Sequence, residues 1–292
     1  MSPVLNSAPQ TTRRWWTTAV WFGGLLLICY GPVLYGLVRQ WDKDPDMGHG
    51  FFVPVIAAFI TWQKRDQLLA LKANPNWWGL ALVIYAGFQL VIGSLGAEIF
   101  LTRTAFILAL VGTILLLGGT NFLRALAFPI FVLCFMVPLP LFLYTRITFP
   151  LQILASRIAD HALTLLQIPV LREGNILELP MQRLSVVEAC SGIRSLLSLT
   201  FLAVIYGYFF EKRVWMRVLL FLATIPIAII ANASRVTLTG VLTEFRPELA
   251  EGFFHTAEGW VIFMVSLAML IAFHQVLGWS YRLLVYARRQ EA

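Results

Sequence analysis

Charged residues are scarce in this chain of 292 residues. Lys, Arg, Asp and Glu together make up 13% of it, whereas 59% of the residues are hydrophobic. An average soluble domain contains about 25% charged residues, and a soluble fold cannot hide so much apolar surface behind so little charge. Apolar runs of about 20 residues recur, the length a helix needs to cross ~30 Å of hydrocarbon. We therefore expect an all-α, polytopic integral membrane helical bundle.

Cysteine is also rare, and the sequence lacks the spacings that mark metal and nucleotide sites. Three cysteines are too few for a disulfide framework. No group of His, Cys, Asp and Glu has ligand spacing, and no glycine-rich phosphate loop is present. We therefore expect no metal and no cofactor. Cys29 and Cys134 lie within apolar runs and are expected to be small buried hydrophobic residues.

The apolar runs predict about eight spans within a single membrane domain over 1–292. They fall at about 15–38, 51–63, 77–96, 104–120, 122–145, 192–210, 217–239 and 257–280. The segment 146–191 is the least membrane-like part. Its first half resembles an interfacial helix that Pro169 stops, and 175–187 alternates weakly, as in a small hairpin or irregular cap.

The formal net charge of +7 would suggest nucleic acid in a soluble protein. In a membrane protein, cytoplasmic loops collect Lys and Arg, and no nucleic-acid partner is expected. Basic residues gather in alternate loops, among them Arg13, Arg14, Lys64, Arg65, Lys72, Lys212, Arg213, Arg217, Arg288 and Arg289. This pattern predicts that both termini are cytoplasmic and that 146–191 forms an extracytoplasmic cap.

Cys190 differs from the other two cysteines because it lies where the cap joins the sixth predicted span. Unpaired backbone N–H groups at the start of a helix favour an anion. A helix N-terminus and nearby cations lower the pKa of a thiol, and the thiolate is its reactive form. Two interpretations stay open for Cys190 alone, a nucleophile or a small residue at a helix cap.

Two further polar positions fall at the predicted outer ends of the last two spans. Arg235 lies in an apolar helix, where an ionisable residue is a functional candidate, although it could also reach lipid headgroups. Asn232 is three residues away, on the same helix face. His255, at the start of the eighth span, can exchange a proton near neutral pH, but a structural histidine is the alternative.

Successive spans cross the membrane in alternating directions, so the outer ends of the sixth, seventh and eighth predicted spans lie at the same depth in the membrane. A thiol, a guanidinium and an imidazole then lie together. Nucleophilic acyl transfer requires a nucleophile, a base that holds its proton and a fixed cation for the developing oxyanion. The set Cys190, Arg235 and His255 supplies each of these roles once.

Three stretches resemble the signature regions of the exosortase/archaeosortase family: ACSGIRS at 189–195, NASR at 232–235 and FFHTAEGW at 253–260. The resemblance covers about 40–280 and includes the region 41–54. There the family typically has Tyr-Ser-His-Gly, whereas this chain has Met-Gly-His-Gly at 47–50. Family members are multi-pass membrane enzymes that process the C-terminal sorting signals of exported proteins, PEP-CTERM proteins in bacteria.

The resemblance implies a cysteine-type peptidase or transpeptidase in the cell inner membrane, with its active site at the extracytoplasmic face. Cys190 would be the nucleophile that forms a thioester, His255 the general acid/base, and Arg235 the stabiliser of the oxyanion or thiolate. The implied partners are exported proteins that carry a C-terminal sorting signal, and membrane lipids.

Four further residues are candidates for supporting roles. Asn232 and Glu258 each lie three residues from a proposed catalytic group on the same helix face, where they could orient it. Glu188 would bind a basic residue beside the sorting signal, and His49 would line the mouth of the pocket or cap its loop.

A transporter or flippase of lipid-linked material is the alternative function, with Arg235 binding a phosphate. Transporters favour charged residues at the bilayer midplane and broken helices. In this chain the candidate residues concentrate at one face, which favours the enzyme.

Overall fold

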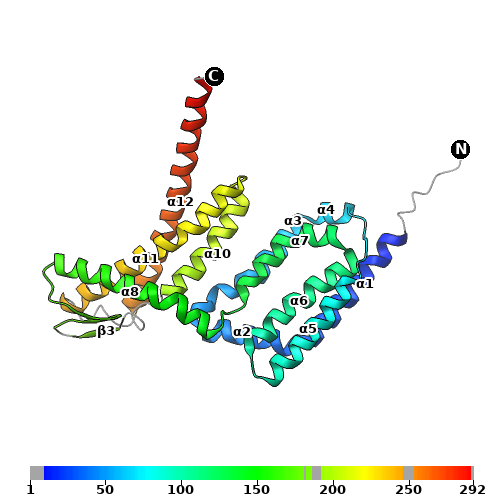
Figure 1. Cartoon of the computed structure of the whole chain (residues 1–292), viewed down its shortest axis with the longest axis horizontal. Helices are drawn as coiled ribbons and strands as arrows, with labels where there is room; N and C mark the ends of the chain where they lie inside the picture. Colours follow the sequence, from blue (N-terminus) through cyan, green and yellow to red (C-terminus); the bar gives the residue numbers. More distant parts are fainter. Residues whose placement is uncertain (1–9, 181, 186–191, 246–252, 291–292) are drawn as a thin grey trace. The chain divides into compact units, whose positions relative to one another are not determined.

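The computed structural model describes residues 10–180, 182–185, 192–245 and 253–290, and the chain forms two compact units, 1–140 and 141–292 (Figure 1). Nearly all described segments of both units are helical, which confirms the all-α membrane class. Four described helices are long and apolar enough to cross a membrane, or up to six if each of two bent pairs is one span. This range is below the expected eight because the helices at 51–63 and 192–210 have apolar stretches shorter than 18 residues.

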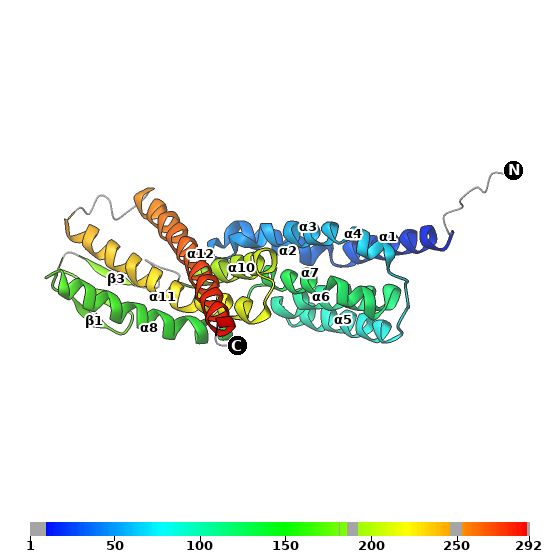
Figure 2. The same cartoon turned by 90° about the horizontal axis from the view of Figure 1, so that it is seen from above.

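The first unit contains seven α-helices and two short 3-10 helices among its described residues: α1 Gln10–Cys29, α2 Gly31–Lys43, η1 Pro45–Phe51, α3 Phe52–Gln63, α4 Arg65–Ala70, α5 Trp78–Leu95, α6 Ile99–Gly118, α7 Thr120–Leu133 and η2 Cys134–Met136. Figure 2 shows α5, α6 and α7 running side by side. The closest approach is between α5 and α6, because a Cβ at Gly79 would collide with the backbone of Gly112 and Leu116. Small residues allow this spacing between apolar helices.

Two of the expected spans are broken by proline. The first divides into α1 and α2 with a bend of 66°, and Pro32 lies in the first turn of α2. The fifth was expected to continue to 145, but it ends at Met136, and a new helix starts at Leu141 after a bend of 81°. Pro138 and Pro140 explain this correction, since proline lacks a backbone donor and drives the preceding residue out of the helical region.

The second unit begins with α8 Leu141–Leu165 and a three-stranded antiparallel sheet of β1 Leu171–Glu173, β2 Ile176–Glu178 and β3 Arg183–Ser185. The sheet confirms the hairpin expected at 175–187 and adds β1 to it. Leu177 of β2 pairs with Arg172 and Leu184 in register. It is fully buried beneath α8 together with Leu163, so the cap has its own apolar core.

Three long helices complete this unit: α10 Gly192–Phe210, α11 Val214–Phe245 and α12 Phe253–Gln290. A three-residue turn makes α10 and α11 antiparallel. Their register is fixed by the hydroxyls of Thr200 and Thr224, which lie 3.2 Å apart. Leu270 of α12 is fully buried against both helices, and the three helices therefore form one packed bundle.

The outer surface of both units is strongly apolar, as lipid contact requires. Cys29 and Cys134 are exposed on this surface, which corrects the expectation that they are buried. The expectation relied on a rule for soluble proteins, in which apolar residues leave the surface. In a membrane the surrounding hydrocarbon is itself apolar, so small hydrophobic residues remain there without penalty.

Candidate active site

The part of α11 that carries Asn232 and Arg235 is held by the cap. Val236, the residue after Arg235, is fully buried in the cluster formed by α8 and the strands. One turn further on, a Cβ at Gly240 would lie 3.2 Å from two methyl carbons of Leu163. Asn232 is also buried, with 7% of its surface exposed. This packing leaves α11 little freedom to rotate, so it fixes the direction from which the Arg235 side chain leaves the helix.

The guanidinium of Arg235 lies against α12 at Gly259. A Cβ built on this glycine would be 3.4 Å from the central carbon and from both terminal nitrogens of the guanidinium. The planar cation therefore rests on the bare backbone of α12, where a larger side chain would displace it. The two motifs that contain Arg235 and His255 are thus in direct contact.

The contact between Arg235 and Gly259 lies close to the start of α12, where residue 255 is found. Residue 255 lies in the first turn of α12 and precedes Gly259 by four residues, so both positions share one face of the helix. Residue 258 directly precedes Gly259, in the second turn. Cys190 and Glu188 lie outside the described residues, as do the side chains of His255 and Glu258.

The α10–α11 register indicates which part of α11 faces the start of α10. Counting eight residues back from Thr200 reaches Gly192, the first residue of α10, and counting eight residues forward from Thr224 reaches Asn232. Both steps cover about 12 Å at 1.5 Å per residue. The described start of α10 is therefore level with Asn232, and Cys190 precedes that start by two residues in the sequence.

The other end of the three-helix bundle is joined by a polar cluster. Nδ1 of His274 is 2.9 Å from the Tyr206 hydroxyl, and Nε2 is 3.2 Å from Oε2 of Glu211. Glu211 also accepts a bond of 2.8 Å from the backbone N–H of Arg213. Burial raises the pKa of Glu211, but its hydrogen bonds with Arg213 and His274 outweigh this and lower the pKa overall. The cluster connects the α10–α11 turn to α12 and so helps to fix the helices that carry Arg235 and Gly259.

His49 lies in η1 of the first unit, where it is partly buried. Burial lowers the pKa of its imidazole, and hydrogen bonds with the backbone of Phe135 and Asp46 offset only part of this effect. These contacts link η1 to η2, and both roles considered for His49, at the mouth of the pocket or as a loop cap, stay predictions. Within the described ranges, no group of three or more His, Cys, Asp and Glu side chains is arranged to hold a metal ion.

The fold and these contacts define the class first: a polytopic helical membrane protein with a fixed guanidinium where two long helices meet. The chain matches the transmembrane exosortase family over residues 41–272, most of its length and parts of both units, and belongs to that family. The family comprises membrane-embedded proteases and transpeptidases that process the sorting signals of exported proteins. No curated protein and no solved structure matches the chain.

Sequence reasoning missed two features of this bundle. Gly259 had a usable signal, because a glycine one turn after His255 in a helix of bulky residues marks a close approach. The partners of His274 had none, since Glu211 is 63 residues away and only the folded bundle brings the two side chains together.

Proposed function

We propose that this protein cleaves the C-terminal sorting signals of exported proteins by nucleophilic catalysis with Cys190, through a thioester. The observation that carries the proposal is the contact of the Arg235 guanidinium with Gly259, one helical turn from residue 255. It joins a fixed cation to the helix face that carries the only histidine among the three family motifs.

The described geometry supports a role for each group. A guanidinium carries five N–H donors in a rigid plane, and its contact with α12 holds that plane in place before the reaction. Asn232 lies on the same face of α11, level with the start of α10, which Cys190 precedes by two residues. Arg235 and residue 255 thus belong to two packed helices, α11 and α12, and the third helix of the bundle, α10, begins two residues after Cys190 in the sequence.

The reaction proceeds in two halves. His255 takes the proton of the Cys190 thiol, and the thiolate attacks the carbonyl carbon of the scissile peptide bond. Arg235 donates hydrogen bonds to the oxyanion that forms. Collapse of this intermediate breaks the C–N bond, and His255 protonates the departing amine. Water or an acceptor amine then attacks the thioester, loses its proton to His255 and releases the Cys190 sulfur.

The substrate would be a PEP-CTERM-type protein held in the inner membrane by its own C-terminal apolar segment. We infer from the distribution of basic residues that both termini are cytoplasmic and that the site faces the extracytoplasmic side. Membership of an enzyme family favours this function over a transporter of lipid-linked material, in which Arg235 would bind phosphate.

Substitution of each cysteine tests the proposal. We expect Cys190→Ala to abolish processing of a co-expressed PEP-CTERM substrate, followed by the mass of the product on a gel, while the protein remains in the membrane at its usual level. Cys29→Ala and Cys134→Ala are matched controls that should keep full activity, because both residues are exposed and belong to the first unit, whereas α11 and α12 belong to the second. Processing by Cys190→Ala at the wild-type rate would rule out the thioester mechanism.

A further inference from the structure

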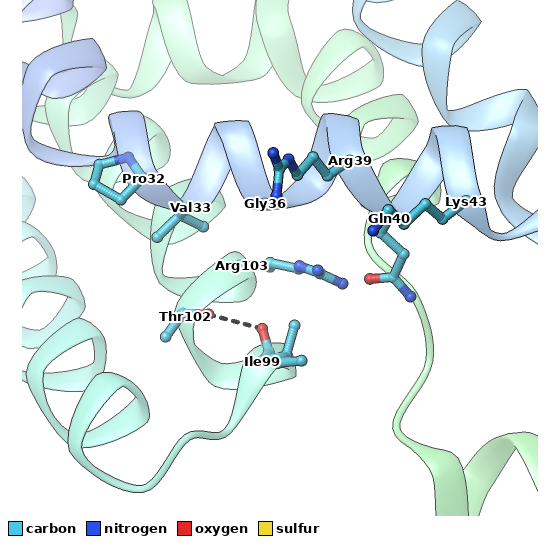
Figure 3. Close-up of a pocket in the computed structure, with 9 residues that line it drawn as sticks. All are labelled: Pro32, Val33, Gly36, Arg39, Gln40, Lys43, Ile99, Thr102 and Arg103. Carbon is cyan, nitrogen blue, oxygen red and sulfur yellow. Dashed lines mark hydrogen bonds between the residues drawn. The ribbon is translucent and has the colours of Figure 1, made fainter.

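A cavity of about 590 Å³ in the first unit lies between α2 and the start of α6, and three cations line it. Figure 3 shows the side chain of Arg103 extending from α6 across the cavity toward Gln40 on α2. Arg39 and Lys43 are four residues apart on α2 and so share one face of that helix. Asp42, Asp44 and Glu98, the acidic residues nearest to the lining in sequence, do not line the cavity. Its charge is therefore entirely positive.

Arg103 is the most constrained of these cations. Only 5% of its surface is exposed, yet no side chain or backbone group in the described part of the chain forms a hydrogen bond or ion pair with its guanidinium. Arg39 by contrast lies over the ring of Tyr35, 4.9 Å from its centre. None of the Arg103 nitrogens is among the buried polar atoms without a partner, so the guanidinium opens onto the cavity and its unpaired charge attracts an anion there. The position of Arg103 in a cavity with two more cations thus calls for an anion.

The rest of the lining indicates what carries the anion. Pro32, Val33 and Gly36 continue the same stripe of α2 away from Lys43, and Thr102 and Ile99 line the cavity from α6, with Ile99 beside the Arg103 side chain (Figure 3). The stripe from Pro32 to Lys43 is about 16 Å long at 1.5 Å per residue. One end of the cavity is thus cationic and the other apolar, a combination that fits an amphiphilic molecule.

We propose that this cavity binds a phosphate group, with Arg103, Arg39 and Lys43 as its ligands, and that the phosphate is carried by a lipid whose chain lies along Pro32, Val33 and Ile99. Guanidinium groups bind phosphate oxygens through paired, charge-assisted hydrogen bonds, and a lysine adds a point charge. The site lies within the first unit and does not depend on the reaction proposed for the second.

Binding to the purified full chain in a neutral detergent tests the proposal. Native mass spectrometry would compare phosphatidic acid with diacylglycerol, which has the same chains but no phosphate. We expect the wild-type protein to retain phosphatidic acid and not diacylglycerol. Arg103→Gln should weaken retention of phosphatidic acid by about tenfold or more, because it removes a buried charged donor pair. Lys43→Gln, at an exposed position, should weaken it by several-fold without any risk to folding.

Arg124→Gln is the matched control, since it removes the same charge from an exposed position of α7 in the same unit and should leave retention within twofold. Inorganic phosphate, measured by calorimetry, separates the two sources of the anion. Gly36→Leu adds a side chain where a Cβ meets no atom within 4 Å, so it should fill the apolar end and reduce lipid binding while phosphate binding persists.

Equal retention of diacylglycerol and phosphatidic acid by the wild-type protein would overturn the proposal. So would equal retention of phosphatidic acid by the wild-type protein and the folded variants Arg103→Gln and Lys43→Gln. Binding of inorganic phosphate that depends on Arg103, without retention of phosphatidic acid, would support the phosphate site and reject the lipid as its source.

Discussion

Enlarging Gly259 tests the contact on which the proposed mechanism depends. The guanidinium of Arg235 is 3.4 Å from the place of a Cβ at this position, close to the contact distance of about 3.5–4.0 Å between nonbonded atoms. Gly259→Ala therefore fits with little movement, and alanine also favours the helix by about 1 kcal/mol. The methyl groups of Gly259→Val extend about 1.5 Å further, and they would push the guanidinium away by about 1 Å.

A displacement of about 1 Å in a catalytic group can cost about 100-fold in rate. We therefore expect Gly259→Val to lower the rate of substrate processing by about two orders of magnitude, and Gly259→Ala to stay within a few-fold of wild type. The assay follows product release in isolated membranes, with the amount of enzyme measured in parallel. Gly278→Val is the matched control, because Gly278 lies in the same helix and a Cβ there meets no atom within 4 Å. Wild-type processing by Gly259→Val would refute the role of this contact.

Three further predictions concern the cation, the polar cluster and a turn. Arg235→Lys should lower the processing rate by 100-fold or more although the charge remains, because lysine lacks the planar set of donors; a wild-type rate would exclude an oxyanion role. Glu211→Gln should reduce the free energy of unfolding by about 1.5 kcal/mol at pH 7, measured by thermal unfolding in detergent. Since the folded-state pKa of Glu211 is lowered, its contribution exists above the ordinary pKa of 4.5 and is lost as the pH falls through the folded-state value. The difference from wild type should thus disappear in acid, and a constant difference would contradict the reasoning. Gly119→Ala should cost about 2 kcal/mol or more, because φ is +82° and a Cβ would collide with a backbone oxygen; Gly87→Ala, with open space around it, should leave the unfolding temperature at or slightly above that of wild type.

The membrane class follows from the sequence because apolar runs of helical length leave few alternative folds. The breaks within those runs were harder to predict. Pro138 and Pro140 are visible signals, but the surrounding residues are apolar enough to suggest that a single span continues to 145. In a membrane the hydrophobic pattern is nearly the same on both sides of a kink, so hydropathy locates a span better than its ends.

The contacts between residues of different helices could be predicted from the sequence only in part. The placement of Arg235 near the start of the last helix follows from the threading of the last spans. The particular contact with Gly259 does not, because it depends on how α11 is rotated, and Val236 sets that rotation by packing into the cap. The cationic cavity around Arg103 was likewise missed, since its walls come from two helices more than 50 residues apart in the sequence.

The hairpin of α10 and α11 also bears on which substrates the enzyme accepts. The apolar part of α10, Ser195–Phe210, is about 24 Å long, shorter than the ~30 Å thickness of the hydrocarbon core. The paired hydroxyls of Thr200 and Thr224 and the cluster around His274 prevent α10 and α11 from sliding past each other. The length of this hairpin is therefore constant. A substrate anchored by its own apolar segment would then present its scissile bond to Cys190 only if that segment is about as long as α10. Under the proposed mechanism, the number of residues in the anchor would select substrates together with the motif that precedes it.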